Sequence, residues 1–356
     1  MHDAKNIERV AGQRTMAGFH GTELNHDLRF LIDTLGVGGI ILFSRNITGR
    51  EQLANLCKGA DDYARTIGMP PLMIAVDQEG GAVARLKAPD FTEFNGAPCI
   101  KNEHDAAAFA RTTALEMRGV GINMDMAPVM DVAPEGFDSI MADRIYSRDP
   151  GQVAQVGCTV IDQLQKAGIM AVAKHFPGIG RTALDSHAER PDLDLPLETL
   201  EQFELIPFYA AIARRVSGIM LSHVRFTRID PEWPASLSPE IGEALLRKKM
   251  GYTGVVFTDD LEMGAIQNHY DMPVITRQVL AADVDVALIC ETRTRIEDAF
   301  ESMCRQISDN SAFANKSERS IARIKALKAS FDVSLGDVSL GQSQQADAPD
   351  AHSSRQ

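Results

Sequence analysis

The stretch KHFPGIGRTALDSHAERP, residues 174–191, is unusually rich in polar and turn-forming residues for a simple connection. Asp185 and His187 lie two residues apart within it. On extended backbone this spacing brings both side chains to one side of the chain, so the carboxylate can hold the imidazole in one tautomer. Such an imidazole can act as a general acid or base near neutral pH, although a local hydrogen bond that stabilises the loop would use the same pair.

A pair of aspartates, Asp259 and Asp260, follows the apolar run VVFT. Because side chains alternate along a strand, one aspartate should face a pocket and the other should point away. We assign the functional role to Asp259 and expect Asp260 to be the N-cap of the next helix. A nucleophilic carboxylate with a separate acid/base pair is the minimum set for retaining glycoside hydrolysis, here with a histidine in place of the usual second carboxylate.

Other charged residues suit the binding of sugar hydroxyls through charge-assisted hydrogen bonds. They are Asp77, Arg85, Arg144 and Lys174. Lys174 is the most informative, because a lysine directly after the apolar run 169–173 needs a partner or a ligand.

Several of these residues, and two histidines, also have purely structural interpretations. Asp77 would serve equally as a turn cap, Arg85 as a solvated surface charge and Arg144 as half of an ion pair. Taken alone, His175 and His223 are each expected to be hydrogen-bonded core histidines.

Two other classes of protein fit some of these residues. A metal-dependent barrel hydrolase would draw its ligands from His175, Asp185, His187, His223 and Asp259. Against it, no His-x-His follows the first expected strand, and Lys174 and Arg144 would repel a cation. A non-catalytic sugar-binding protein would keep Asp77 and Lys174 without needing the three proposed catalytic residues.

Eight short apolar runs, separated by amphipathic helical patterns, must position these side chains. The expected strands are 14–19, 36–44, 71–77, 121–132, 168–176, 218–224, 254–260 and 285–290. Apolar runs without alternation are typical of parallel strands covered on both faces. The pattern predicts a single-domain (β/α)8 barrel, with an open α/β sheet as the alternative. The polar residues fall where these strands end, which is where barrels place their active sites.

Helical periodicity fills the gaps between these strands. Three helices are expected at 152–167, 200–216 and 239–250, and two more follow the last strand at 294–307 and 312–330. No linker divides the chain, so we expect one barrel domain over residues 1–335. The tail at 336–356 is rich in Gly, Ser, Gln and Asp and is expected to be disordered.

The composition narrows the partners and the compartment. The 356-residue chain has a formal net charge of -13, which disfavours a nucleic-acid surface. Its five cysteines form no Cys-x-x-Cys pair, which is typical of reduced thiols. The N-terminus has no apolar signal core, and no apolar run is long enough to span a membrane. We therefore expect a cytoplasmic monomer.

Five segments of the chain resemble glycoside hydrolase family 3, in particular its bacterial β-N-acetylglucosaminidases. They are VDQEGGAVARL, APVMDV, ADRIYSRDP, KHFPGIGRTALDSHAERP and GVVFTDDLEM. The resemblance runs in collinear order over roughly residues 10–330. It implies a (β/α)8 barrel without metal or organic cofactor. It also implies a carbohydrate substrate that carries terminal β-linked N-acetylglucosamine, with cell-wall fragments as its expected source.

The resemblance also implies roles for individual residues. Asp259 matches the nucleophile of the family, His187 the group that transfers the proton, and Asp185 the group that orients it. The positions that match sugar-binding residues are Asp77, Arg85, Arg144, Lys174 and His175. Family β-glucosidases often need a second domain, so the single-domain N-acetylglucosaminidase branch fits this chain better, with a β-glucosidase as the alternative.

The chain departs from the family pattern at three positions. Ile179 stands where the family loop usually has histidine, Arg181 adds a cation nearby, and Ala82 replaces an arginine. These changes bear on leaving-group preference more than on reaction type. A histidine acid/base also leaves phosphorolysis open as a minor alternative. Glycines on both sides of Ile179 predict a loop that moves.

Overall fold

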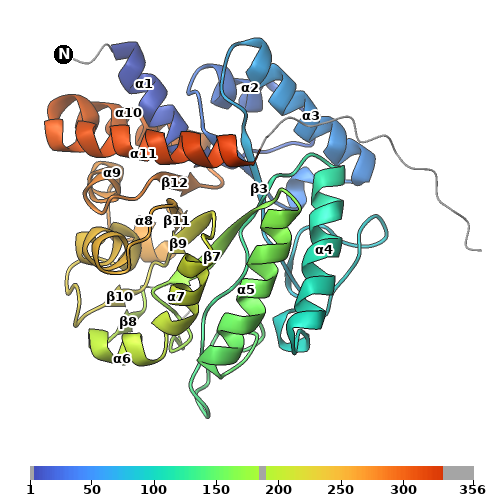
Figure 1. Cartoon of the computed structure of the whole chain (residues 1–356). Helices are drawn as coiled ribbons and strands as arrows, with labels where there is room; N and C mark the ends of the chain where they lie inside the picture. Colours follow the sequence, from blue (N-terminus) through green and yellow to red (C-terminus); the bar gives the residue numbers. More distant parts are fainter. Residues whose placement is uncertain (1–3, 184–189, 332–356) are drawn as a thin grey trace, which may run out of the picture.

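The fold is a closed barrel of parallel strands surrounded by helices, seen in a computed structural model that describes residues 4–183 and 190–331 (Figure 1). In barrel order the eight strands are β1 (Thr15–Ala17), β12 (Val286–Ile289), β11 (Val255–Asp260), β9 (Gly218–Leu221), β7 (Met170–Phe176), β6 (Met124–Asp125), β3 (Met73–Val76) and β2 (Gly39–Leu42). Because β1 pairs with both β2 and β12, the sheet has no open edge. The predicted (β/α)8 barrel is confirmed.

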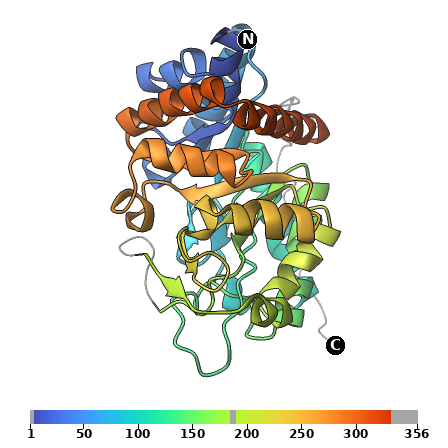
Figure 2. The same cartoon turned by 90° about the vertical axis from the view of Figure 1, so that its left-hand side faces the viewer.

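Helices occupy the outside of the strands. The α-helices are α1 (Ala4–Gln13), α2 (His26–Asp33), α3 (Arg50–Thr66), α4 (Glu103–Gly119), α5 (Pro150–Lys166), α6 (Leu197–Gln202), α7 (Leu205–Ala213), α8 (Gly264–Gln267), α9 (Met272–Ala281), α10 (Arg293–Asp309) and α11 (Ser311–Ser330). Glu240–Lys249 (η4) is a π-helix, and short 3₁₀ turns lie at Ser44–Asn46, Ala97–Cys99 and Ala235–Leu237. Figures 1 and 2 show α1 beside α10 and α11, so the two ends of the described chain pack together.

Local sequence explains where several of these elements begin and end. The Asp149 side chain accepts a hydrogen bond from the Gln152 amide at 2.7 Å and starts α5. The expected helix 200–216 is two helices, α6 and α7, because Pro207 has no amide hydrogen to donate to the Phe203 carbonyl oxygen. Glu204 at the junction is buried and pairs with Arg181. The expected strand 121–132 keeps only β6 as a regular strand, since Pro128 has no amide hydrogen to donate to a ladder.

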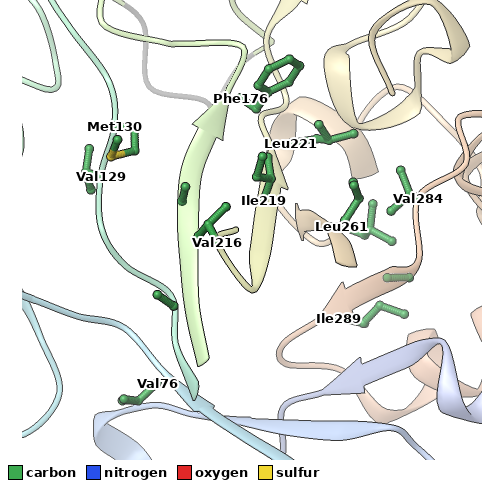
Figure 3. Packing of buried hydrophobic residues seen from close by; sticks show 14 of the residues in the cluster. Val76, Val129, Met130, Phe176, Val216, Ile219, Leu221, Leu261, Val284 and Ile289 are labelled. Carbon is green, nitrogen blue, oxygen red and sulfur yellow. The ribbon is translucent and has the colours of Figure 1, made fainter. Parts of the chain in front are cut away.

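Alternation along the strands separates two apolar layers. Met73 and Ala75 of β3 face the barrel interior, whereas Ile74 and Val76 face the surrounding helices. Figure 3 shows part of the outer layer, which includes Ile219, Leu221 and Ile289. The interior is rich in methionine on several strands: Met16, Met73, Met124, Met126, Met170 and Met220.

Two small two-stranded ribbons extend from the end of the barrel at which the strands finish. One joins β4 (Gln78–Gly80) to β5 (Val83–Ala84) directly after β3. The other pairs β8 (Asp192–Leu193) with β10 (Arg225–Phe226). Both ribbons belong to loops that follow barrel strands, so they lie on the side of the barrel where the polar residues are expected.

Candidate active site

The inward alternation of three strands places a charged residue at the same end of each. Asp77 comes two residues after inward-facing Ala75, Lys174 two after Val172, and Asp259 two after Phe257. These side chains therefore reach the mouth of the barrel. They line a cavity of about 170 Å³ together with Glu79, Arg85, Arg144, His175 and Asp260. Six of the eight predicted site residues thus share one cavity, whereas Asp185 and His187 lie outside the described residues.

Lys174 is the centre of the charge network in this cavity. Its Nζ lies 2.7 Å from Asp77 Oδ1 and 2.7 Å from Glu79 Oε1, and its side chain is only 3% exposed. Burial alone lowers the pKa of Lys174, but the two carboxylates raise it more, so its net pKa is above the usual value. The sequence-based expectation that this lysine needs a partner is therefore met by two acidic partners.

The β4–β5 ribbon returns Arg85 to Asp77. Gly80 and Gly81 have φ values of +86° and +60°, which the tight turn requires. The Gln78 side chain accepts hydrogen bonds from the amides of Arg85 and Leu86, both at 2.9 Å. An Arg85 guanidinium nitrogen then lies 3.2 Å from Asp77 Oδ2.

Asp77 is ionised under all ordinary conditions. Burial would raise the pKa of Asp77, but Lys174 and Arg85 lower it further, to about 2. Its carboxylate is therefore available to accept hydrogen bonds from a ligand.

Arg144 is paired with Glu79. Its Nε and terminal nitrogen donate to the two Glu79 oxygens at 2.9 and 2.8 Å, a bidentate arrangement. Burial raises the pKa of Glu79, yet Lys174 and Arg144 outweigh it, so that pKa lies below its usual value. The interpretation of Arg144 as half of an ion pair is correct, and the same guanidinium still lines the cavity.

His175 is held from behind by Asp131. His175 Nδ1 lies 2.7 Å from Asp131 Oδ2, and Asp131 Oδ1 accepts a hydrogen bond from the Ile179 amide at 2.8 Å. On the other side of the ring, Nε2 lies 3.4 Å from an Arg144 nitrogen. With Nδ1 donating to Asp131, Nε2 is the acceptor nitrogen and is turned toward the cavity.

Asp259 is held as a carboxylate at the end of β11. Its Oδ1 accepts a hydrogen bond from the Asp260 amide at 2.8 Å. Burial raises the pKa of Asp259, but His223, His175 and Lys174 together with this amide lower it more, so the net pKa is below the usual value. An ionised carboxylate at the mouth of the barrel is what a nucleophile requires.

Asp260 is not the helix N-cap that the sequence predicts. The next helix, α8, starts at Gly264 with Met263 at its N-cap. Asp260 Oδ1 instead accepts hydrogen bonds from the amides of Glu262 at 3.0 Å and Cys290 at 3.2 Å, which joins the ends of β11 and β12. The strand continues through Asp260, and its carboxylate also lines the cavity.

His223 is the hydrogen-bonded core histidine that was expected. It is 1% exposed, its Nδ1 lies 2.8 Å from Ser236 Oγ, and its Nε2 lies 2.8 Å from the Asp260 carbonyl oxygen. It therefore fixes the backbone behind the two aspartates without lining the cavity.

The described start of the 174–191 loop is fastened to the barrel. A Cβ at Gly178 would come 2.8 Å from Glu204 Cβ, and one at Gly180 would come 1.9 Å from the Val132 carbonyl oxygen. Arg181 forms an ion pair with buried Glu204, which is 1% exposed. The two glycines are thus required for close packing on both sides of Ile179.

Comparison with known proteins agrees with this geometry. Residues 6–327 match the glycosyl hydrolase family 3 N-terminal domain. The chain belongs to glycosyl hydrolase family 3. The predicted family and the predicted class of enzyme, a glycoside hydrolase of this kind, are therefore confirmed.

Relatives of this family 3 chain carry consistent names. The β-hexosaminidase of Idiomarina loihiensis is 34% identical over 288 residues, which are 78% of this chain and 84% of the relative. The β-hexosaminidase of Alkalilimnicola ehrlichii is 37% identical over 285 residues, which are 77% of this chain and 80% of the relative.

Solved structures agree as well. A family 3 β-N-acetylglucosaminidase from Paenibacillus sp. str. FPU-7 has a TM-score of 0.89 at 35% identity, covering 96% of this chain and 66% of its own. A β-N-acetylhexosaminidase from Beutenbergia cavernae has a TM-score of 0.85 at 25% identity, and the match covers 91% of this chain and 98% of the other chain.

Sequence reasoning missed two acidic residues of this family 3 site, Glu79 and Asp131. Both lie in segments that carry the family resemblance, but neither stands at a strand end, and their partners are 65 and 44 residues away in the chain. A signal was present for Asp131 in the apolar context PVMDV, where a buried carboxylate needs a partner.

The family 3 chain shows no clustered metal ligands among residues 4–183 and 190–331: no group of three or more His, Cys, Asp or Glu there is arranged to hold an ion. Of the ligands that a metal site would use, Asp185 and His187 are outside these ranges. Within the same ranges no helix is both long and apolar enough to cross a membrane.

Proposed function

We propose that this family 3 enzyme is a retaining β-N-acetylhexosaminidase that removes terminal, non-reducing β-linked N-acetylglucosamine. The observation that carries the proposal is the placement of Asp259, an ionised carboxylate in the same cavity as the Lys174–Asp77 pair. The names of its relatives, β-hexosaminidases and β-N-acetylglucosaminidases, support the sugar.

The reaction begins with attack by an Asp259 oxygen on the anomeric carbon. As this bond forms, the bond from that carbon to the leaving oxygen breaks, and His187 gives its proton to the leaving oxygen. Asp185 orients the imidazole. A covalent glycosyl-enzyme results. His187 then takes a proton from water as the water oxygen attacks the anomeric carbon. The bond from that carbon to the Asp259 oxygen breaks, Asp259 is restored as a carboxylate, and the sugar departs with its β configuration retained.

The charged floor of the cavity holds the sugar. Asp77 accepts hydrogen bonds from hydroxyl groups, while Lys174, Arg85 and Arg144 donate to hydroxyl oxygens. His175 presents Nε2 to the same space because Asp131 occupies Nδ1. Each cation is already paired with a carboxylate, so these donors are in position before substrate arrives and need little reorganisation.

The natural substrates we propose are fragments of bacterial peptidoglycan, hydrolysed in the cytoplasm without metal or organic cofactor. The family resemblance supports the source. All five cysteines are free, which suits a reducing compartment.

A panel of 4-nitrophenyl glycosides tests the proposed reaction. The β-N-acetylglucosaminide should be cleaved faster than the β-glucoside and the β-N-acetylgalactosaminide, with no effect of phosphate or of a chelator, and proton NMR should detect the β anomer first. A faster glucoside would indicate a β-glucosidase. A sugar phosphate formed in phosphate buffer would indicate a phosphorylase, and inactivation by the chelator a metal enzyme.

Two variants test the proposed roles. Asp259→Ala should abolish turnover while the circular dichroism spectrum is unchanged, and Asp298→Ala, an exposed aspartate on α10, should behave as wild type. His187→Ala should slow substrates with poor leaving groups far more than activated ones. Equal losses on both kinds of substrate would remove His187 from the role of general acid.

A further inference from the structure

An exposed apolar side chain lies at the entrance of the cavity. Four large apolar side chains among the described residues are exposed: Ile67, Leu115, Ile140 and Tyr209. Ile140, which is 40% exposed, lines the cavity, and the other three do not. Exposed apolar surface that continues into a polar binding cavity is a typical feature of ligand contact.

Ile140 is one of three apolar residues that we call the apolar rim: Ile140, Met141 and Ile179, all of which line the cavity. They come from two separate loops, after β6 and after β7. The Ile140 amide donates to the Thr182 carbonyl oxygen at 3.1 Å, and Thr182 donates through its amide and its hydroxyl to the Ile179 carbonyl oxygen at 3.0 and 2.7 Å. Thr182 therefore holds the two isoleucines in a fixed relation.

The backbone of the rim is also tied to the site itself. The Ile179 amide donates to Asp131, which orients His175, and an Arg144 nitrogen lies 3.5 Å from Met141 Sδ. The rim is thus as firmly placed as the charged floor, and it adjoins the floor on the side formed by Arg144 and His175.

The rim shares a loop with the proposed acid/base pair. The loop after β7 passes from Ile179 through Thr182 toward Asp185 and His187. On the proposed function, on which this inference rests, the leaving group must lie where His187 can protonate its oxygen. Ile179 belongs to the same loop, so the rim is the described apolar surface that the leaving group is expected to contact.

The rim offers apolar contact rather than charge. The cations beside it are committed to carboxylates: Arg144 to Glu79 and Arg181 to Glu204. A six-membered ring presents a C–H or π face that packs favourably on aliphatic side chains. We infer that Ile140, Met141 and Ile179 form a platform for the ring of the leaving group, either an aryl group or a second pyranose.

Leaving groups with and without a ring test this platform. The substrates are the 4-nitrophenyl glycoside, chitobiose and the N-acetylglucosaminyl-N-acetylmuramic acid disaccharide, compared with N-acetyl-β-glucosaminyl azide, whose leaving group has no ring. Ile140→Ser should lower kcat/KM about 5- to 30-fold on the three substrates with rings, as expected for the loss of apolar contact, and leave the azide unchanged. Equal factors on the neutral and the acidic disaccharide are expected, because the contact carries no charge.

Matched variants separate contact from folding. Ile140→Leu should retain near-normal kcat/KM, and Ile67→Ser, an equivalent change at a 43% exposed site after α3, should have no effect. Ile179→Ser should resemble Ile140→Ser but also lower the melting temperature, since Ile179 is 5% exposed.

Three results would overturn the inference. In the first, Ile140→Ser is as active as wild type on the substrates with rings, so the rim makes no contact. In the second, it loses the same factor on the azide, so the change acts on the sugar subsite. In the third, wild-type enzyme cleaves none of the four compounds, which rejects the proposed function itself and is distinct from the other two.

Discussion

Asp131 orients the imidazole of His175, because Asp131 Oδ2 lies 2.7 Å from His175 Nδ1. Asp131 is fully buried and does not line the cavity, whereas His175 lines it. The other Asp131 oxygen accepts the Ile179 amide at 2.8 Å. One carboxylate therefore fixes both the imidazole that faces the sugar and the first described turn of the loop that continues toward Asp185. Such a group acts on substrate only through the residues that it positions.

Asp131→Asn should therefore impair catalysis without unfolding the protein. The two contacts use different Asp131 oxygens, and asparagine replaces one of these oxygens with an NH2 donor, so one of the two contacts loses its acceptor. We expect kcat/KM to fall about 10- to 100-fold, the range for loss of one hydrogen bond to a charged group. Nitrogen-15 NMR of the imidazole should show a shift toward the other tautomer. Wild-type kinetics with an unchanged tautomer would contradict the positioning role.

Lys174→Met should shift the pH dependence of stability. The folded pKa of Asp77, about 2, is below its unfolded value near 4, so the stability it contributes is present above pH 4 and is lost as pH falls from 4 toward 2. Removing Lys174 leaves Asp77 and Glu79 as neighbouring buried carboxylates, whose pKa values then rise.

Urea unfolding between pH 3 and pH 7 measures this change. At pH 7 the variant should be less stable by about 3–5 kcal/mol, as for other buried pairs that lose one partner. The difference should shrink as the pH is lowered. Lys58→Met, in an exposed pair with Asp62, should cost less than about 1 kcal/mol at any pH. A pH-independent loss in Lys174→Met would show that packing rather than charge is responsible.

Most residues of this site were predictable from the sequence, and two buried acidic residues were not. Asp77, Lys174 and Asp259 each end an apolar run, and strand periodicity alone turns them inward. Glu79 lies in β4, after the barrel strand has ended, and Asp131 lies in the loop after β6, so neither ends an apolar run. Their partners are set by how the barrel closes, which a local pattern does not contain.

Two of the incorrect local assignments have different origins. Asp260 was expected to cap a helix, but α8 starts only at Gly264, and the Asp260 carboxylate instead binds the end of β12, a strand about 30 residues away in the chain. The helix expected at 200–216 has apolar periodicity on both sides of a break that precedes Pro207, a residue that cannot continue the hydrogen bonds of a helix. A tertiary partner decides the role of Asp260, whereas the break in the helix follows from a local signal that the periodicity does not capture.

Asp260→Asn should flatten the pH dependence of stability between about pH 4 and pH 7. Burial, followed by the charges of Glu262 and Asp259, raises the pKa of Asp260 to about 7. The folded state therefore holds more protons than the unfolded state between about pH 4 and pH 7, so this group makes stability fall as pH rises through that window.

The variant should remove that decline and be more stable than wild type at pH 8. Urea midpoints at pH 5 and pH 8 give the comparison, with Asp298→Asn at an exposed site on α10 as the control. An unchanged difference between the two midpoints would mean that Asp260 is not the group that titrates.

Gly180→Ala should be strongly destabilising for a reason unrelated to backbone φ. A Cβ there would lie 1.9 Å from the Val132 carbonyl oxygen and 2.3 Å from its carbon, and backbone atoms cannot rotate aside as a side chain can. Relief requires that the loop separate from the segment that contains Asp131. We therefore expect a loss of about 2 kcal/mol or more together with a fall in kcat/KM.

Gly68→Ala is the matched comparison, because Gly68 has φ +77° but nothing within 4 Å of the added Cβ. It should cost only about 1–2 kcal/mol from its backbone conformation and leave kcat/KM unchanged. If Gly180→Ala instead kept wild-type stability and activity, the loop would have moved away from Val132 without penalty. That result would favour the hinge interpretation of the two glycines over close packing, and it would also loosen the hold of Asp131 on Ile179 that the apolar rim requires.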